Sequence, residues 1–384
     1  MFRPDFRVDH SFPGALLDLP TSHRVPVSWI RAHASPSIKW RTLNDILPPG
    51  SATAADYAAL KDELLNYKGI TQILRKQRKA GVWGDNILGL APNKPAGIKD
   101  IGTIYQYRRL LEMGIPRDHR AIRLADRVLF RLLSRDDAPE LRFEYKSAAK
   151  QNPRLAIWAR TYHREGATVA LAHSGRADDP RVRGAAHRIA SDISQFLRSE
   201  LAEKPIVRKR SRNMLDPEAY PPTLLSVAAF AHMPNVQRER AGFMERLCAF
   251  LAKPQPKRKY TILVGRKVIQ PSYHLLGNPV EADRYGNAKD VPLALHWIEL
   301  LVRLGMLHTN ETAQKVLARL LGELNSKGVW ASHNLRAMPK GPSKVAAFAF
   351  PLELDGKTMQ RRQADVTFRL ALIAKLAGWR LEYT

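Results

Sequence analysis

Cysteine and acidic charge are both scarce in this sequence. Cys248 is the only cysteine among 384 residues, so no disulfide can form within the chain and no cluster of thiolates can bind a metal. Asp and Glu number 36 against 62 Lys and Arg, which gives a formal net charge of +26. Polyanions are therefore the expected partners, with nucleic acid the leading one and an acidic face of another protein the alternative.

Long apolar runs are also missing. No segment approaches the roughly 18 uncharged apolar residues of a transmembrane helix. Charged residues and Pro4 occupy the N-terminal region, where a signal peptide would need an apolar core. These absences predict a cytoplasmic protein without a membrane span. Hydrophobic residues make up 45% of the chain, which is enough to form a sizeable core.

Helical periodicity begins after an N-terminal arm, residues 1–25, that has no regular pattern. Apolar residues three or four apart predict helices over 35–47, 54–78, 101–113, 179–197, 222–231, 237–251 and 292–304. Several of these segments end at Gly or Pro and are followed by another amphipathic segment. Such helix pairs are typical of a repeat array, so we expect one all-α domain over 26–384. Residues 260–269 are rich in β-branched side chains and predict one small β-hairpin.

A distinctive element ends one of these helices. Gln77, Gly81 and Trp83 form a Gln-x-x-x-Gly-x-Trp pattern, and Gly328 and Trp330 repeat its second half, with Asn325 near the place of the glutamine. The element resembles one in squalene-hopene cyclase and its relatives, the terpenoid cyclase and protein prenyltransferase repeat family. The resemblance covers roughly residues 26–384 and implies an α/α toroid of repeated helix pairs. It also implies that these residues are a structural staple, which ties the end of an outer helix to the next inner helix.

The catalytic signatures of that family are missing. The Asp-x-Asp-Asp motif of the cyclases does not occur, and Cys248 lies in an apolar helical run that suits a zinc ligand poorly. We therefore expect no cofactor and no metal. Four side chains remain candidates for polar groups at a central cavity, and each also fits a turn, cap or core role: Asp85, Tyr273, His274 and His296.

Basic clusters are the more informative candidates for a binding site. They are Arg75, Lys76, Arg78 and Lys79 around Gln77; Lys204, Arg208, Lys209, Arg210 and Arg212; and Lys253, Lys257, Arg258, Lys259, Arg266 and Lys267. If successive repeats stack regularly, the second and third clusters belong to neighbouring connections and form one positive rim. Such a rim would bind phosphates with strong salt dependence and little base readout. A solvated flexible loop is the alternative interpretation.

Composition and motifs together favour a non-catalytic helical-repeat protein that binds a polyanion, with nucleic acid the leading ligand, through a basic rim. The alternative is a cyclase-like or prenyltransferase-like enzyme, in which Lys and Arg neutralise an isoprenoid diphosphate and aromatic rings stabilise cations in a central cavity. A toroidal polysaccharide lyase that uses Tyr and His is a third hypothesis. A linear solenoid of HEAT type is a fourth, which would keep the binding function and change the shape.

Overall fold

Most of the described chain is helical. The computed structural model describes residues 19–84, 86–88, 102–134, 146–209, 211–264, 267–269, 274–332, 343, 346, 348–353 and 358–384. Its α-helices are α1 (Val27–His33), α2 (Pro36–Arg41), α3 (Ala54–Asn66), α4 (Lys68–Arg75), α5 (Thr103–Glu112), α6 (Arg120–Leu133), α7 (Lys146–Gln151), α8 (Pro153–Leu171), α9 (Pro180–Leu197), α10 (Leu224–Ala231), α11 (Pro234–Glu239), α12 (Ala241–Ala252), α13 (Val291–Arg303), α14 (Glu311–Gly322) and α15 (Met359–Leu376). Short π-helical turns, η1 (Thr42–Ile46) and η4 (Ala172–Arg176), extend α2 and α8. No described helix is long and apolar enough to cross a membrane.

Side-chain caps begin several helices at the places that the sequence indicates. Asp179 accepts a hydrogen bond from the Arg181 amide at 2.9 Å and starts α9. Thr223 caps α10 in the same way. Ser35 does not cap α2 with its side chain; its amide instead donates to Glu353 Oε1 at 2.6 Å. The expected helix over 54–78 is divided into α3 and α4 by the extended backbone of Tyr67.

Helix α8 is the longest of the described elements that the sequence analysis did not predict. Asn152 caps it and Pro153 occupies its first turn, so its start follows the usual rules. It packs against α5, α6, α9 and α10, and most of its C-terminal half is buried. Gly166 allows the close approach of α5, since a Cβ atom there would clash with the Ile104 side chain.

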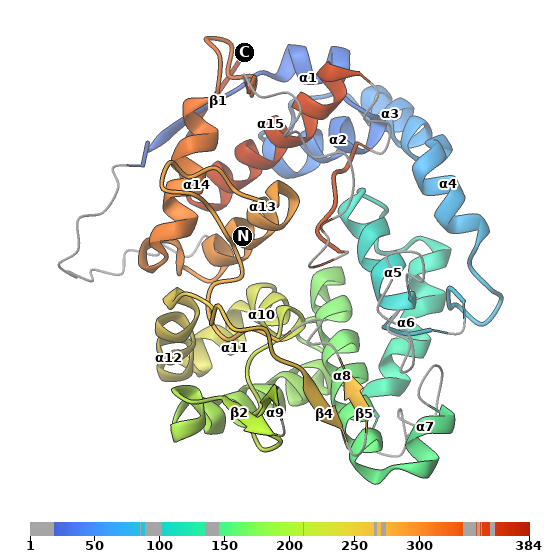
Figure 1. Cartoon of the computed structure of the whole chain (residues 1–384). Coiled ribbons are helices and arrows are strands. Elements are labelled where there is room, and N and C mark those ends of the chain that lie inside the picture. The colour runs from blue at the N-terminus through green and yellow to red at the C-terminus, as the bar shows by residue number, and fades with distance from the viewer. Residues whose placement is uncertain are drawn as a thin grey trace.

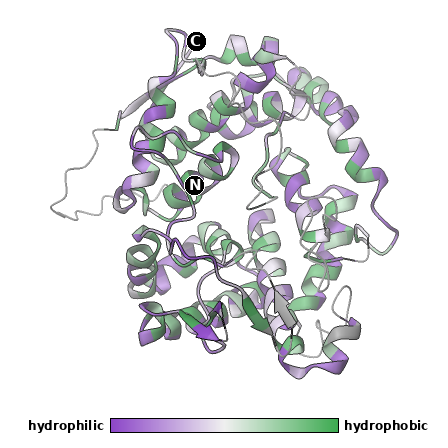
Figure 2. Ribbon diagram, in the orientation of Figure 1, coloured by the Kyte–Doolittle hydropathy of each residue, from purple (hydrophilic) through white to green (hydrophobic). Residues whose placement is uncertain are grey.

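Consecutive helices lie beside one another around the molecule (Figure 1). Helix α8 packs on α10, α10 on α13, and α13 on α15, which reaches back to α1, α2 and η1. Every residue of α10 is buried, and so is nearly all of the middle of α13 and α15. Figure 2 shows purple and green residues mixed along α3 and α4, which lie at the outside of the view. The hydrophobic core is therefore continuous through α8, α10, α13 and α15.

The first and last strands of the described chain meet. Strand β1 (Ser22–Val25) pairs in parallel with β6 (Arg380–Tyr383). The Thr384 amide donates to the Val25 carbonyl at 3.0 Å, and the Ser28 amide donates to the Thr384 carbonyl at 3.1 Å. The last residues of the expected N-terminal arm are thus part of the fold, while residues 1–18 lie outside the described residues.

Two β-hairpins lie between the helices. The expected one is present as β4 (Ile262–Val264) and β5 (Lys267–Ile269). A second hairpin, which the sequence analysis did not predict, pairs β2 (Ile206–Lys209) with β3 (Arg212–Leu215). The hairpins are joined, because Leu215 donates its amide to the Thr261 carbonyl at 2.8 Å. The described residues are thus mostly helical, with three small two-stranded sheets where the sequence analysis expected one hairpin.

Candidate functional site

The Gln77 element is a structural staple. The Gln77 side-chain amide donates to the Ala121 carbonyl at the start of α6, at 2.8 Å. The Trp83 indole donates to the Ile73 carbonyl of α4 at 2.8 Å, and the Trp83 amide donates to Thr103 Oγ1 of α5 at 3.0 Å. Trp83 is 3% exposed, so its hydrogen bonds lie within the core. The element ties three helices together.

The C-terminal repeat of this element has the same backbone geometry with different side chains. Leu324 and Trp330 form an isolated antiparallel bridge, as Gln77 and Trp83 do. The Trp330 amide donates to Thr367 Oγ1 of α15 at 3.0 Å, just as Trp83 bonds Thr103 of α5. Leu324, and not Asn325, therefore takes the place of the glutamine.

Both staple glycines are required by the backbone. Gly81 and Gly328 have φ values of +87° and +80°, which disfavour a residue with a Cβ atom. A Cβ at Gly81 would clash with the Leu124 carbonyl of α6, and one at Gly328 would meet the Arg24 carbonyl of β1. Each glycine thus lets a turn lie against the backbone of another segment.

The described residues of the second and third basic clusters lie on one surface, which we call the hairpin surface: Lys204, the strands β2 and β3, and residues 253–259. Strand β3 contacts β4, and the Asn213 side-chain amide donates to the Lys259 carbonyl at 3.4 Å. The Thr261 amide donates to the Asn213 carbonyl at 3.1 Å. Clusters that are about 45 residues apart in the chain are therefore adjacent in space, as the sequence analysis expected for neighbouring connections.

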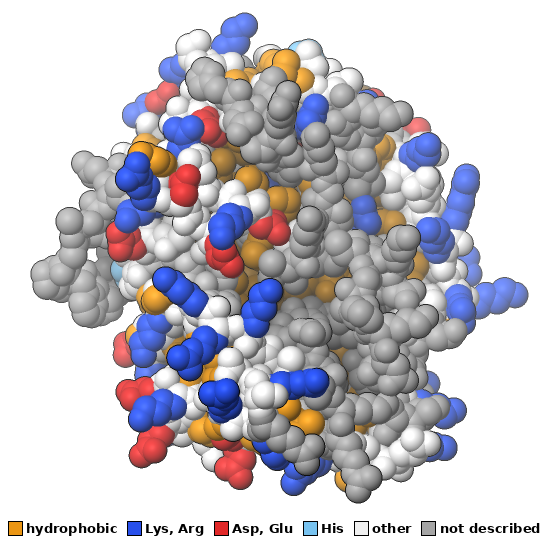
Figure 3. Space-filling model, viewed as in Figure 1, with side chains coloured by type: hydrophobic (Ala, Val, Ile, Leu, Met, Phe, Trp, Pro, Cys, Tyr) orange, Lys and Arg blue, Asp and Glu red, His pale blue; other side chains and the backbone are white. Residues whose placement is uncertain are grey.

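The cations of the hairpin surface are exposed. Their side chains make no ion pair within the described part of the chain: Lys204, Arg208, Lys209, Arg212, Lys253, Lys257, Arg258 and Lys259. Arg210 and Arg266 lie outside the described residues, and for Lys267 only the backbone is described. Figure 3 shows Lys and Arg side chains gathering at the lower left of the visible face, over the region where Figure 1 places α12 and β2.

The first basic cluster is separate from the hairpin surface. Arg75, Lys76, Arg78 and Lys79 are exposed at the end of α4 and in the turn after it. Figure 1 places α4 at the upper right and β2 at the lower left. The three clusters therefore form two basic surfaces and not one.

A pocket of about 380 Å³ lies beside the hairpin surface, between α8 and the strands β3 and β4. We call it the α8 pocket. Trp158 and Tyr162 line it from α8, with ring centroids 4.4 Å apart, and Leu215 and Ile262 line it from the strands. Ile157 is 66% exposed at the edge of this pocket. The pocket is mainly apolar and aromatic, with charged residues at its rim.

Hydrogen-bonded pairs of titratable side chains hold the wall of the α8 pocket. Tyr162 bonds His274, and burial lowers the pKa of His274 to about 3, so this histidine is neutral. Tyr220 donates to the Glu165 carboxylate, which also accepts from Thr223 Oγ1 at 2.8 Å. Burial raises the pKa of Glu165 to about 7 although both hydrogen bonds favour its ionised form.

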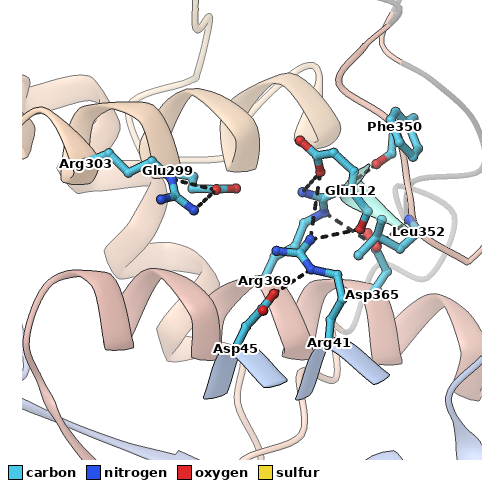
Figure 4. A network of polar contacts seen from close by, with 9 residues as sticks. All are labelled: Arg41, Asp45, Glu112, Glu299, Arg303, Phe350, Leu352, Asp365 and Arg369. Carbon is cyan, nitrogen blue, oxygen red and sulfur yellow. Dashed lines mark hydrogen bonds and ion pairs between the residues drawn. The ribbon is translucent and has the colours of Figure 1, made fainter. Parts of the chain in front are cut away.

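A buried ionic network joins α2, α5 and α15 (Figure 4). The Arg369 guanidinium lies 3.8 Å from a Glu112 carboxylate oxygen and 3.5 Å from one of Asp365. It also donates to the Phe350 carbonyl at 2.6 Å. Arg41 donates to the Glu112 carbonyl at 3.1 Å. Nearby on α13, Arg303 donates to Glu299 at 2.8 Å. The charges in this region are thus largely paired with one another.

The candidates for a central cavity do not come together in the described structure. Asp85 and Tyr273 lie outside the described residues. His274 belongs to the α8 pocket, whereas His296 is buried on α13, where its ring meets Phe348 with centroids 5.4 Å apart. Burial, followed by the charge of Arg108, lowers the pKa of His296 to about 4.

Sequence reasoning missed Trp158, Tyr162, Glu165 and Tyr220. A signal for the first two was present, because Trp158 and Tyr162 stand four residues apart after the Asn152 cap and so share one helical face. No local signal connects Tyr220 with Glu165, since 55 residues separate them. Comparison of the chain with protein-family models, curated proteins and solved structures gives no match.

Proposed function

We propose that this protein binds nucleic acid through the phosphate backbone and that the hairpin surface is the binding site. The observation that carries the proposal is the meeting of two cationic segments, in which Lys and Arg side chains are exposed and lack ion pairs in the described part of the chain. Mutual repulsion makes such a grouping unfavourable unless an anion covers it. The polymer with the matching charge density is a phosphate backbone.

Binding of this kind depends steeply on salt. Each phosphate contact contributes a slope of about −0.9 to log K against log salt for a duplex and about −0.7 for a single strand. Five such contacts would lower the affinity roughly 100- to 500-fold between 50 and 200 mM salt. Because phosphates carry no sequence information, we expect little preference among sequences.

A fluorescence titration with labelled DNA and RNA at these two salt concentrations tests the proposal. The variant Arg208→Glu/Lys209→Glu/Arg212→Glu should lose most of the affinity and part of the salt slope. The matched control, Arg75→Glu/Lys76→Glu/Lys79→Glu, makes the same change of charge at exposed positions on the separate α4 surface. An equal loss in both variants, or no binding by the unaltered protein at 50 mM salt, would contradict the proposal.

The architecture that we propose for this function is an α/α toroid of the terpenoid cyclase type, used as a rigid scaffold without the catalysis of that family. The return of α15 to α1 and α2, the β1–β6 pairing and the two staples support it. The proposed location is the cytoplasm. Small-angle scattering would test the shape, since a linear solenoid of the same length would be far more elongated.

A further inference from the structure

We infer that the α8 pocket binds an unpaired nucleobase of the strand whose phosphates lie on the hairpin surface. This inference rests on the proposed function and deepens it, because it makes single-stranded nucleic acid the preferred ligand. Aromatic side chains beside a cationic groove are the usual means of binding single strands, since every base has a π-face that can stack.

The strands of the hairpins connect the pocket with the charges. Leu215 lines the pocket three residues after Arg212 on β3, and Ile262 lines it three residues after Lys259. Side chains alternate between the two faces of a strand, so Arg212 and Leu215 point to opposite faces of the hairpin. Arg208 lies opposite Asn213, about 7 Å along the strand from Leu215, and is on the same face as Leu215. One nucleic-acid strand can therefore contact both the cations and the pocket.

The pocket has the chemical character that a base requires. Trp158 is half-buried and is the largest aromatic side chain in its wall, and Ile157 adds an exposed apolar side chain at its edge. Arg154 lines the same pocket, is exposed and makes no ion pair in the described part of the chain, so it can contact the phosphate of the inserted nucleotide. The volume of about 380 Å³ falls within the range of small-molecule sites, about 300–1,000 Å³.

Acidic groups at the rim argue against a bare phosphate in the pocket itself. Asp216 and Glu218 also line it, and their carboxylates would repel an anion while accepting hydrogen bonds from the N–H groups of a base. The bases of a duplex are stacked and paired, so they can enter the pocket only after unpairing. The geometry thus favours a single strand over a duplex and over a polyanion without bases.

The test compares three probes: a single-stranded oligonucleotide, a duplex of the same sequence, and inorganic polyphosphate, which has phosphates and no bases. Trp158→Ala should lower the affinity for the single strand about 5- to 150-fold, as expected for the loss of one stacked base, and leave polyphosphate binding unchanged. Trp158→Phe should retain most of the affinity, because a stacking face remains. Trp29→Ala on α1 is the matched control, since Trp29 is also half-buried and lies far from the pocket in the sequence.

The outcomes separate this inference from the proposed function. If polyphosphate and both nucleic acids bind, and Trp158→Ala binds all three like the unaltered protein, the inference is wrong. The proposed binding of phosphates at the hairpin surface is then unaffected. If Trp158→Ala weakens polyphosphate binding as much as single-strand binding, the pocket does not recognise a base and the inference is also wrong. If none of the probes binds at low salt, the proposed function itself is wrong. A circular dichroism melt of each variant establishes that the fold is retained.

Discussion

Glu165 illustrates at the scale of a single residue how burial can outweigh hydrogen bonding. Its carboxylate accepts hydrogen bonds from Tyr220 and Thr223, which stabilise the charged form. The side chain is fully buried on α8, and desolvation raises its pKa from 4.5 to about 7. Between these pH values the folded state binds more protons at this site than the unfolded state. The contribution of this group to stability is therefore complete below pH 4.5 and is lost as the pH rises through about 7.

Replacement of Glu165 by Gln should remove this pH dependence. The amide oxygen can accept one of the two hydrogen bonds, the amide NH2 can donate to the other hydroxyl, and no charge is buried at high pH. We expect Glu165→Gln to gain about 1–3 kcal/mol of unfolding free energy relative to the unaltered protein between pH 5 and pH 8. Urea unfolding of both proteins at the two pH values measures the difference, and parallel pH profiles would contradict the assignment.

At the scale of an element, three helices carry acidic and basic residues four positions apart on their buried faces. These pairs are Glu299 with Arg303 on α13 and Asp365 with Arg369 on α15, while Arg108 and Glu112 share the spacing on α5. In the sequence such spacing is typical of a solvated helix surface, where each pair contributes only about 0.2–0.5 kcal/mol. Here the charges lie between helices, so removing one partner leaves the other buried and unpaired.

Arg369→Met should therefore destabilise the fold strongly. The change leaves the carboxylates of Asp365 and Glu112 without this cation, at a cost of about 3–5 kcal/mol. Arg188→Met is the matched control, because Arg188 forms a pair of the same spacing with Asp192 on α9 with its side chain 82% exposed. That control should change stability by less than about 0.5 kcal/mol. Chemical denaturation of both variants measures the effect, and similar small changes in both would show that the network contributes little.

At the scale of the whole molecule, the pairing of β1 with β6 joins the first and last helices. Parallel strands so far apart in the chain cannot be joined by a local turn, so their pairing depends on the intervening helices. Helix α15 packs against both β strands and against α1 and α2. The N-terminal helices are thus held by the last residues of the chain.

Removal of residues 380–384 should lower the local stability of the N-terminal helices more than that of the other helices. The Ser28 amide loses its acceptor, the Thr384 carbonyl, and β1 loses its only strand partner among the described residues. Hydrogen exchange should become faster in α1 and remain unchanged in α9. Glu382→Ala is the control, since it removes the weak, half-exposed pair with Arg24 at 3.9 Å and keeps the backbone. Unchanged exchange in α1 after truncation would mean that other contacts hold this end.

The sequence by itself determined the features that depend on neighbouring residues. The helix starts at Asp179 and Thr223, the predominance of helix and the hairpin at 262–269 follow from local propensity and capping. The staple glycines Gly81 and Gly328 are indicated by the Gly-x-Trp pattern, and the structure has both at positive φ. All of these could be recognised because the groups involved lie within a few residues of one another.

Only the tertiary structure decided which distant residues meet. The β2–β3 hairpin joins Thr261, Tyr220 reaches Glu165, and Arg369 lies against Glu112, and each contact connects segments more than 40 residues apart. In the same structure, charge pairs with the spacing typical of a surface helix form a buried network. An aromatic pocket lies beside a cationic surface. Burial and proximity of this kind arise from the packing of helices against one another, and local sequence patterns carry no information about it.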